Sequence, residues 1–286
     1  MSLRFLVMEG SPAHSANRFR EGYGRSPAEH YGDTLVALHG AGAYDIVRAA
    51  DPDGRLPQGA QLGDYDGVVI TGSPLNLWKQ EPESMRQVAL AREIFEAKVP
   101  FFGSCWGLQV AAVAAGGTVH LNPRGREFGF ARRISPTSDG ARHALLAGRS
   151  AFYDAPCAHQ DEVATLPAGS TILASNGVSR VQAAEIRHAG GTFWGVQYHP
   201  EFGPDVLAYI LDQYANDLVS EGFFAEASQS SAYCADLRML AEAPDRKDIS
   251  WRLGLNPDVL DQTLRTIEIT NFIAHCQLES GRRRAA

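Results

Sequence analysis

Cys105 is the first side chain whose setting predicts chemistry, because it lies between two glycines in the stretch Gly-Ser-Cys-Trp-Gly at 103–107. An apolar run at 99–102 precedes it and an alanine-rich run at 110–115 follows it, which predicts a strand, a sharp turn and a helix with the thiol at the turn. The glycines allow a tight turn with positive φ. We expect the helix N-terminus to favour the thiolate, the nucleophilic form of cysteine. A buried structural cysteine is the alternative interpretation.

A cysteine nucleophile needs a base, and His199 is the candidate because it follows a predicted strand at 192–197, at the sheet edge where active sites of α/β proteins lie. Glu201 is two residues further along an extended segment, so its side chain returns to the same side as His199. Pro200 between them stiffens the segment. A carboxylate beside an imidazole fixes its tautomer and stabilises the imidazolium ion. The pattern predicts a Cys-His-Glu catalytic triad.

Acyl transfer also needs hydrogen-bond donors for the oxyanion that forms on the substrate. The backbone N–H of Trp106, at the start of the helix after the cysteine, is one candidate. Gly72 is the other, because it ends a predicted strand at 66–71 and lets the backbone approach a substrate. An ordinary turn at 72–74 is the alternative interpretation.

The elements that must position these residues alternate in type. Apolar runs predict strands at 3–8, 44–47, 66–71 and 99–102, and helical spacing predicts helices at 30–41 and 83–97. This alternation is typical of an α/β fold with a mostly parallel, doubly wound sheet that helices cover on both faces.

A polar segment at 11–29 interrupts this alternation, and its lack of periodicity predicts a long loop. It contains Arg18, Arg20 and Arg25, which could close over the site and pair with a substrate carboxylate. A mobile surface loop without such a role is the alternative.

The C-terminal half has a different pattern. Short strands with turn residues between them predict an added β-hairpin region at 118–121, 128–134, 171–174, 181–186 and 192–197. A helix begins at Pro204. Beyond about residue 220 we expect helices only, including one that Asn256 caps, with Pro257 as its first residue and Leu260, Leu264 and Ile267 along it.

Composition excludes several classes of function. The net charge of −7 over 286 residues gives no general attraction to nucleic acid or to an anionic membrane. The start of the chain does not resemble a secretion signal and no apolar run is long enough to span a bilayer, so we expect a cytoplasmic protein. The four cysteines form no C-x-x-C pair, and no nucleotide-binding motif is present. We therefore expect no metal and no cofactor.

At this point the motifs resemble those of a known family, the class I glutamine amidotransferases. The stretch 103–109 resembles their G-x-C-x-G-x-Q elbow, and 195–201 resembles their G-x-Q-x-H-P-E motif. Residues 71–74 resemble the oxyanion strand, and 158–163 the loop that flanks the substrate. The resemblance covers roughly 3–214 and is greatest to stand-alone members that resemble the glutaminase domain of GMP synthase.

The resemblance implies a flavodoxin-like fold for a domain at 1–220, with a helical extension at 221–286. It also implies that Cys105 attacks the side-chain amide of glutamine to form a γ-glutamyl thioester, while His199, oriented by Glu201, passes a proton to the leaving ammonia. The N–H groups of Gly72 and Trp106 would hold the oxyanion, and water would release glutamate.

The same resemblance implies that Gln109 and backbone groups near Ala158 and His159 hold the glutamine. His159 is also an alternative base. We rank it below His199 because no carboxylate is placed beside it in the same way, although Asp161 keeps the option open.

Three positions depart from the family pattern: Ser104 and Trp106 beside the cysteine, and Ala158 before the histidine. They border the substrate, so three functions remain open. The first is a glutaminase that delivers ammonia to a separate synthase subunit. The second is a free-standing hydrolase of γ-glutamyl amides or peptides, and the third is a non-catalytic binding or regulatory protein. The extension at 221–286 could mediate self-association or dock a partner.

Overall fold

The computed structural model describes residues 2–285, with side chains through Arg283. Among these residues, nine strands form one sheet in the order β2-β1-β3-β4-β11-β10-β9-β6-β7. The first five strands in this order pair in parallel. They are β2 (Gly42–Val47), β1 (Leu3–Met8), β3 (Gly67–Ile70), β4 (Phe101–Ser104) and β11 (Gly191–Val196). The expected α/β fold with a doubly wound parallel sheet is confirmed.

The other half of the sheet is antiparallel and corresponds to the expected hairpin region. It contains β10 (Ala183–His188), β9 (Thr171–Ser175), β6 (Glu127–Pro136) and β7 (Tyr153–His159). A separate pair joins β5 (Thr118–Leu121) to β8 (Asp161–Thr165). Strands β7 and β8 are not predicted by the local sequence pattern. Pro156 and the lack of β-branched residues weaken the strand signal of β7, and the structure tolerates this proline because β7 is an edge strand.

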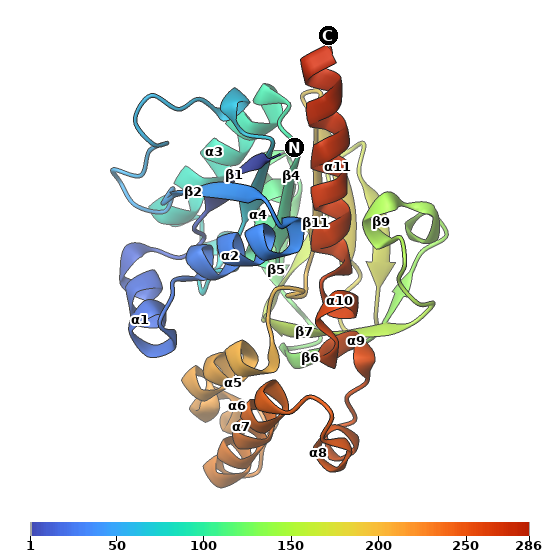
Figure 1. Cartoon of the computed structure of the whole chain (residues 1–286). Helices are drawn as coiled ribbons and strands as arrows, with labels where there is room; N and C mark the ends of the chain where they lie inside the picture. Colours follow the sequence, from blue (N-terminus) through green and yellow to red (C-terminus); the bar gives the residue numbers. More distant parts are fainter. Residues whose placement is uncertain (1, 286) are drawn as a thin grey trace.

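Helices cover both faces of the sheet (Figure 1). On one face, α3 (Pro82–Ala97) and α4 (Trp106–Ala114) share a core with Ile70 and Phe101. On the other, α2 (Pro27–His39) and α11 (Ile267–Ala285) pack against Phe5, Val69 and Phe102. The parallel strands are therefore buried on both sides, which explains their uninterrupted apolar sequences.

The expectation of a long loop at 11–29 is wrong. The segment forms α1 (Ala13–Tyr23) and the first turn of α2. Gly24, with φ 90°, ends α1. Ser26 and Glu29 then form a capping box, with Pro27 at the first position of α2. The helices went unrecognised because most of α1 is polar, so it lacks the apolar periodicity that reveals an amphipathic helix.

The described chain beyond β11 is helical, as expected. Its helices are α5 (Pro204–Gln213), α6 (Ala215–Ser220), α7 (Ala227–Glu242), α8 (Lys247–Arg252), α9 (Pro257–Leu260), α10 (Gln262–Arg265) and α11. The single helix expected after Asn256 is three helices. Asn256 caps α9 as expected, but Asp261 caps a new helix, α10, before α11 begins.

The C-terminal helices pack in two places. Helices α5, α7 and α8 form a cluster around Leu207, Leu237 and Ile249, whereas α11 returns to the central sheet, where Phe272 is buried. Figure 1 shows α11 lying along the sheet and α5 to α8 below it. The division of the chain at residue 220 stays a prediction. No helix in the described part of the chain is both long and apolar enough to cross a membrane.

Candidate active site

Cys105 lies between β4 and α4 with φ 50° and ψ −98°, a backbone conformation that a residue with a side chain rarely adopts. Its N–H donates to Val196 O at 2.7 Å, which ties the turn to β11. The positive φ is at the cysteine itself, and the glycines on either side serve a different need. A Cβ at Gly103 would lie 2.7 Å from Gly107 Cα, and one at Gly107 would lie 2.8 Å from Ile70 O. Both glycines are therefore required for space.

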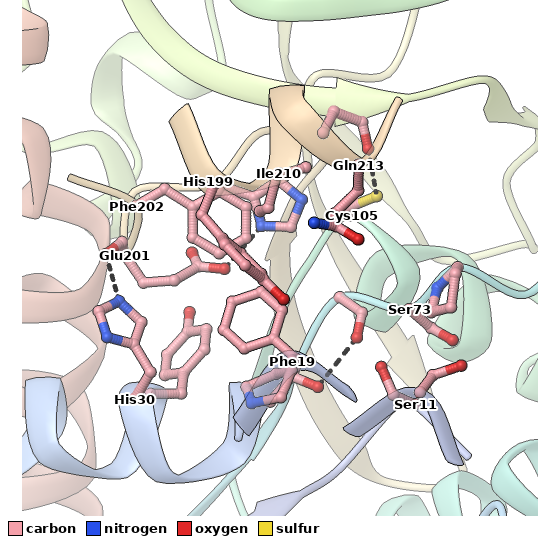
Figure 2. Close-up of a pocket in the computed structure, with 18 of the residues that line it drawn as sticks. Ser11, Phe19, His30, Ser73, Cys105, His199, Glu201, Phe202, Ile210 and Gln213 are labelled. Carbon is pink, nitrogen blue, oxygen red and sulfur yellow. Dashed lines mark hydrogen bonds and ion pairs between the residues drawn. The ribbon is translucent and has the colours of Figure 1, made fainter. Parts of the chain in front are cut away.

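His199, the expected base, and Glu201, the carboxylate expected to orient it, lie in the same pocket as Cys105 (Figure 2). His199 Nδ1 and Glu201 Oε1 are 2.6 Å apart, and both side chains are almost fully buried. The His199 ring stacks on Phe202 with 4.0 Å between centroids and 5° between planes. His199 also donates its backbone N–H to Pro156 O at 2.8 Å. The ring is thus held through its backbone, on one face and at Nδ1.

The thiol of Cys105 is neutral at physiological pH. Burial raises its pKa to about 12, and the negative charges of Glu201 and Asp161 add to this. The N–H of Trp106 and the amide of Gln197 lower the pKa, but by less. The helix N-terminus thus favours the thiolate as expected, but the loss of hydration on burial outweighs this effect and keeps the thiol neutral. Attack by this sulfur requires a base.

The two residues expected to bind the oxyanion flank the triad. Gly72 lies so close to His199 that a Cβ at position 72 would be 2.7 Å from the ring Cε1 and 3.5 Å from Nε2. The Trp106 backbone N–H begins α4 beside the sulfur. The Trp106 indole points elsewhere, donating from Nε1 to Gln87 Oε1 at 2.8 Å. At position 106 the backbone is thus available to a substrate, whereas the side chain belongs to the core.

Gly72→Ala should lower kcat by about 100-fold, since the added methyl group forces the His199 ring out of place and a shift of about 1 Å has that effect. Steady-state kinetics, with circular dichroism to verify folding, provide the measurement. Gly63→Ala is the matched control, because a Cβ there meets nothing within 4 Å. Unchanged kcat in Gly72→Ala would contradict the assigned position of His199.

The three residues expected to hold the substrate separate into two groups. Ala158 lines the pocket, and its carbonyl oxygen accepts a hydrogen bond from the Cys105 thiol at 3.8 Å. Gln109 is a buried residue of α4, and its amide donates to Asp161 O at 3.2 Å and to Gln197 Oε1 at 3.4 Å. The side chains of Gln109 and His159 are not among those that line the pocket.

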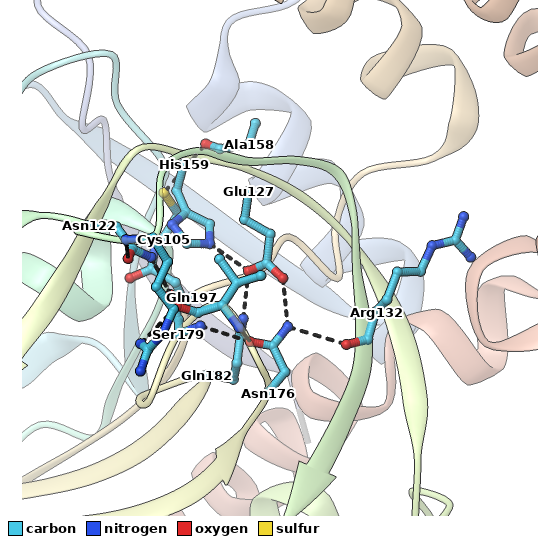
Figure 3. Close-up of polar contacts among 12 residues, drawn as sticks. Cys105, Asn122, Glu127, Arg132, Ala158, His159, Asn176, Ser179, Gln182 and Gln197 are labelled. Carbon is cyan, nitrogen blue, oxygen red and sulfur yellow. Dashed lines mark hydrogen bonds and ion pairs between the residues drawn. The ribbon is translucent and has the colours of Figure 1, made fainter. Parts of the chain in front are cut away.

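His159 does have a carboxylate beside it, contrary to expectation. Its Nε2 is 2.9 Å from Glu127 Oε2, and its Nδ1 is 3.0 Å from Asp161 O. Glu127 also accepts hydrogen bonds from Asn176 at 2.5 Å and Gln182 at 2.7 Å, as Figure 3 shows. With both ring nitrogens engaged, His159 is unsuited to be the base. It anchors the strand end that presents Ala158 to the pocket.

The pocket has a volume of about 310 Å³ and extends beyond the triad to α1 and α5. Ser11, Ser15 and Ser73 form a polar side. An apolar side comes from Phe19, Phe202, Tyr209, Ile210 and Tyr214. Apart from Ser73, these residues were not singled out from the sequence, since no motif marks them and α1 was expected to be a loop.

Of the three arginines considered for a substrate carboxylate, two are already paired. Arg20 pairs with Glu29 at 2.6 Å and Arg25 with Asp33 at 2.8 Å. Arg18 lines the pocket and has no ion-pair partner among the described side chains. Within residues 2–285, no group of three or more His, Cys, Asp or Glu side chains is arranged to hold a metal ion.

Comparison with known proteins is consistent with this geometry. A relative from a Pseudomonas species, γ-glutamyl-L-1-hydroxyisopropylamide hydrolase, is 30% identical over 285 residues, covering 99% of this chain and 96% of that protein. A GMP synthase from Nitrosomonas eutropha is 29% identical over 163 residues, which cover 55% of this chain but 30% of the synthase. A Thermotoga maritima glutamine amidotransferase has the same fold, with a TM-score of 0.66 at 16% identity over 97% of this chain and 98% of that one. The family model for class I glutamine amidotransferases matches residues 38–213, and the chain belongs to that family.

Proposed function

We propose that this protein is a free-standing hydrolase that uses Cys105 to cleave γ-glutamyl amides into glutamate and an amine. The main observation is that the pocket continues from the thiol to the apolar side formed by α1 and α5. If the substrate were glutamine, the leaving group would be ammonia, which is too small to contact this apolar side. An amine with a hydrocarbon substituent would bury apolar surface against it.

The first half of the reaction forms an acyl-enzyme. His199 Nε2 takes the thiol proton while Glu201 stabilises the resulting imidazolium through Nδ1. The sulfur of Cys105 attacks the γ-carbonyl carbon, and the N–H groups of Gly72 and Trp106 hold the oxyanion. The C–N bond then breaks as His199 gives its proton to the leaving amine. A γ-glutamyl thioester remains.

Water completes the cycle. His199, now neutral, accepts a proton from a water molecule that attacks the thioester carbonyl, and the same donors hold the second oxyanion. When this intermediate breaks down, the sulfur leaves and regains a proton from His199. The products are glutamate and the free enzyme, so no metal, cofactor or second protein is needed.

The leaving group should lie on the His199 side, because His199 protonates its nitrogen. Phe202 stacks on that ring, and Figure 2 shows Phe19 projecting into the same part of the pocket. Phe19 packs edge-on against Tyr209 of α5, with ring centroids 5.0 Å apart. Two helices therefore build the apolar side together, and α1 lies outside the segment that matches the family model.

The extent of the similarities also supports this proposal. The relative that aligns along nearly the whole chain has the name of a γ-glutamyl amide hydrolase, whereas the GMP synthase extends well beyond the aligned region. The second candidate is a glutaminase that hydrolyses glutamine and delivers ammonia to a separate synthase subunit; the elbow at Cys105 and the motif at 195–201 support it. Cytoplasmic location and self-association through the C-terminal helices stay predictions.

A series of substrates that differ in the leaving amine tests whether the apolar side of the pocket binds that amine. The isolated chain should release glutamate from γ-L-glutamyl isopropylamide with a kcat/KM about tenfold or more above that for L-glutamine, because a hydrocarbon substituent fills the apolar side. Phe19→Ala should lower kcat/KM for the isopropylamide by about tenfold and change the value for glutamine much less.

The control for this series is Phe152→Ala, which removes a phenylalanine that is 59% exposed and outside the pocket lining. It should leave both substrates unaffected. Slow turnover confined to glutamine, unchanged in Phe19→Ala, would instead support the glutaminase that awaits a synthase partner.

A further inference from the structure

We infer that Ser104 and Tyr31 are positioning residues that hold the carboxylate of Glu201, and that α2 is thereby part of the machinery that orients His199. This inference rests on the proposed function. It concerns a series of hydrogen bonds to the Glu201 carboxylate oxygen that does not contact the His199 ring. Ser104 is one of the positions that depart from the family pattern, and Tyr31 precedes the segment that the family model matches.

This series consists of three short hydrogen bonds. His199 Nδ1 is 2.6 Å from Glu201 Oε1, the other carboxylate oxygen accepts from Ser104 Oγ at 2.9 Å, and Ser104 Oγ is 2.9 Å from the Tyr31 hydroxyl. Tyr31 and Ser104 are at most 1% exposed, and Glu201 is 4% exposed. Bulk water therefore cannot replace either hydroxyl.

The direction of donation follows from the acceptors. An ionised carboxylate only accepts, so Ser104 must give its single proton to Glu201. Ser104 Oγ then accepts from Tyr31, which must stay protonated. Burial, followed by the charge of Glu201, raises the pKa of Tyr31 well above its usual value, in agreement with this assignment.

Helix α2 holds Glu201 a second time through its backbone. The Nε2 of His30, the residue before Tyr31, is 3.0 Å from the carbonyl oxygen of Glu201. The start of α2 is itself fixed, since the N–H of Ala28 donates to the buried carboxylate of Glu9 at 2.9 Å. The acid of the triad is thus fixed by its side chain and its main chain to one anchored helix.

These contacts have a consequence for the proton balance of the triad. Donation from Ser104 stabilises the ionised form of Glu201, which in turn keeps the Nδ1–H tautomer of His199 and leaves Nε2 free. The other titratable groups that act on this site are His30 and Tyr31 from α2, Cys105 from the elbow, Asp161 from β8 and Glu268 from α11. If the hydroxyl of Ser104 is lost, Oε2 is buried without that donor, and the His199–Glu201 pair binds a proton more tightly.

Kinetics of γ-L-glutamyl isopropylamide hydrolysis test this in Ser104→Ala, Tyr31→Phe and the double variant. Ser104→Ala should lower kcat by about tenfold with little change in KM, and should move the acid limb of the pH profile upward by roughly half a unit or more. Tyr31→Phe should act in the same direction with a smaller effect. The double variant should match Ser104→Ala, because Tyr31 acts through the serine.

Tyr44→Phe is the matched control. Like that of Tyr31, its hydroxyl joins α2 to a strand, in this case by donation from β2 to Asp33 at 2.9 Å, but it is not part of the series of hydrogen bonds that reaches Glu201. This variant should leave the pH profile unchanged. The inference would be overturned if a folded Ser104→Ala variant showed an unshifted acid limb. It would also be overturned if the effects of Tyr31→Phe and Ser104→Ala on kcat were fully additive in the double variant.

A spectroscopic measurement separates this inference from the proposed function. The proton in the short His199–Glu201 hydrogen bond should give a low-field NMR signal that disappears in His199→Gln. The signal should shift in Ser104→Ala and Tyr31→Phe but not in Tyr44→Phe, whichever substrate the enzyme uses. Absence of Cys105-dependent turnover would refute the proposed function alone, whereas an unshifted signal would refute the positioning role.

Discussion

Cys105→Ala should reduce γ-glutamyl amide hydrolysis by at least about 1,000-fold, since removal of a nucleophile leaves only the contribution of binding and of the oxyanion donors. The fold should remain intact, because the contacts that the sulfur makes are weak, such as its 3.8 Å hydrogen bond to Ala158 O. Glutamate release by the purified variant, compared with the unmodified chain, is the measurement.

The matched control is Cys234→Ala, the same substitution at a buried cysteine in the helical cluster of α5, α7 and α8. It should keep full activity. Iodoacetamide offers a second check on the nucleophile, because a thiol with a pKa of about 12 is neutral at pH 7. The rate at which iodoacetamide inactivates the unmodified enzyme should rise about tenfold per pH unit between pH 7 and 9, because the thiolate fraction of Cys105 does. A rate independent of pH would contradict the neutral thiol.

Glu268→Ala should lower the free energy of unfolding by about 3–5 kcal/mol, because it leaves the guanidinium of Arg149 buried without its counter-ion. The two side chains are at most 1% exposed and form two hydrogen bonds of 2.6 and 2.7 Å. Glu268 also accepts from the hydroxyl of Tyr198, the residue before His199, at 2.7 Å. Urea unfolding should reveal the loss, and the midpoint of thermal unfolding should fall by roughly 10 °C.

Two comparisons identify the cause of this loss. The double variant Arg149→Met/Glu268→Met should recover much of the stability, since it removes both buried charges together. Asp248→Ala, which breaks the exposed pair with Arg246, should change stability far less than Glu268→Ala, because solvent screens this pair. If Glu268→Ala and Asp248→Ala had equal effects, burial of the Arg149–Glu268 pair would not be the cause of the loss.

Local sequence accounts for the elbow and the strand-helix alternation. Apolar periods are set by the geometry of each element, so β1, β3, β4, α3 and α4 could be predicted before any contact was known. The motif at 195–201 likewise placed His199 and Glu201 just after a strand. The expected extended segment is wrong, however: residues 199–202 form a turn in which the Phe202 N–H donates to His199 O at 3.1 Å, and this turn brings the two side chains together. Such statements need only neighbouring residues.

Elements with weak local signals were missed. Helix α1 is mostly polar, and it forms because Phe19 and Tyr23 pack on Tyr209, nearly 190 residues away in the chain. Strand β7 contains a proline and is stabilised by pairing with β6. In both cases the energy that decides the structure comes from a partner that a sequence window does not contain.

The sequence by itself determined that a glycine-flanked cysteine follows one strand of an α/β sheet, and that a histidine and a glutamate follow another. The tertiary structure decided how those groups behave. Burial makes the Cys105 thiol neutral, and the carboxylate of Glu127 contacts the ring of His159. Tyr31 and Ser104, which are 73 residues apart in the sequence, form a hydrogen bond, and α1 and α5 form the apolar side of the pocket. The reason is physical: backbone conformation follows from local sequence, whereas desolvation and hydrogen-bond partners depend on which distant segments pack together.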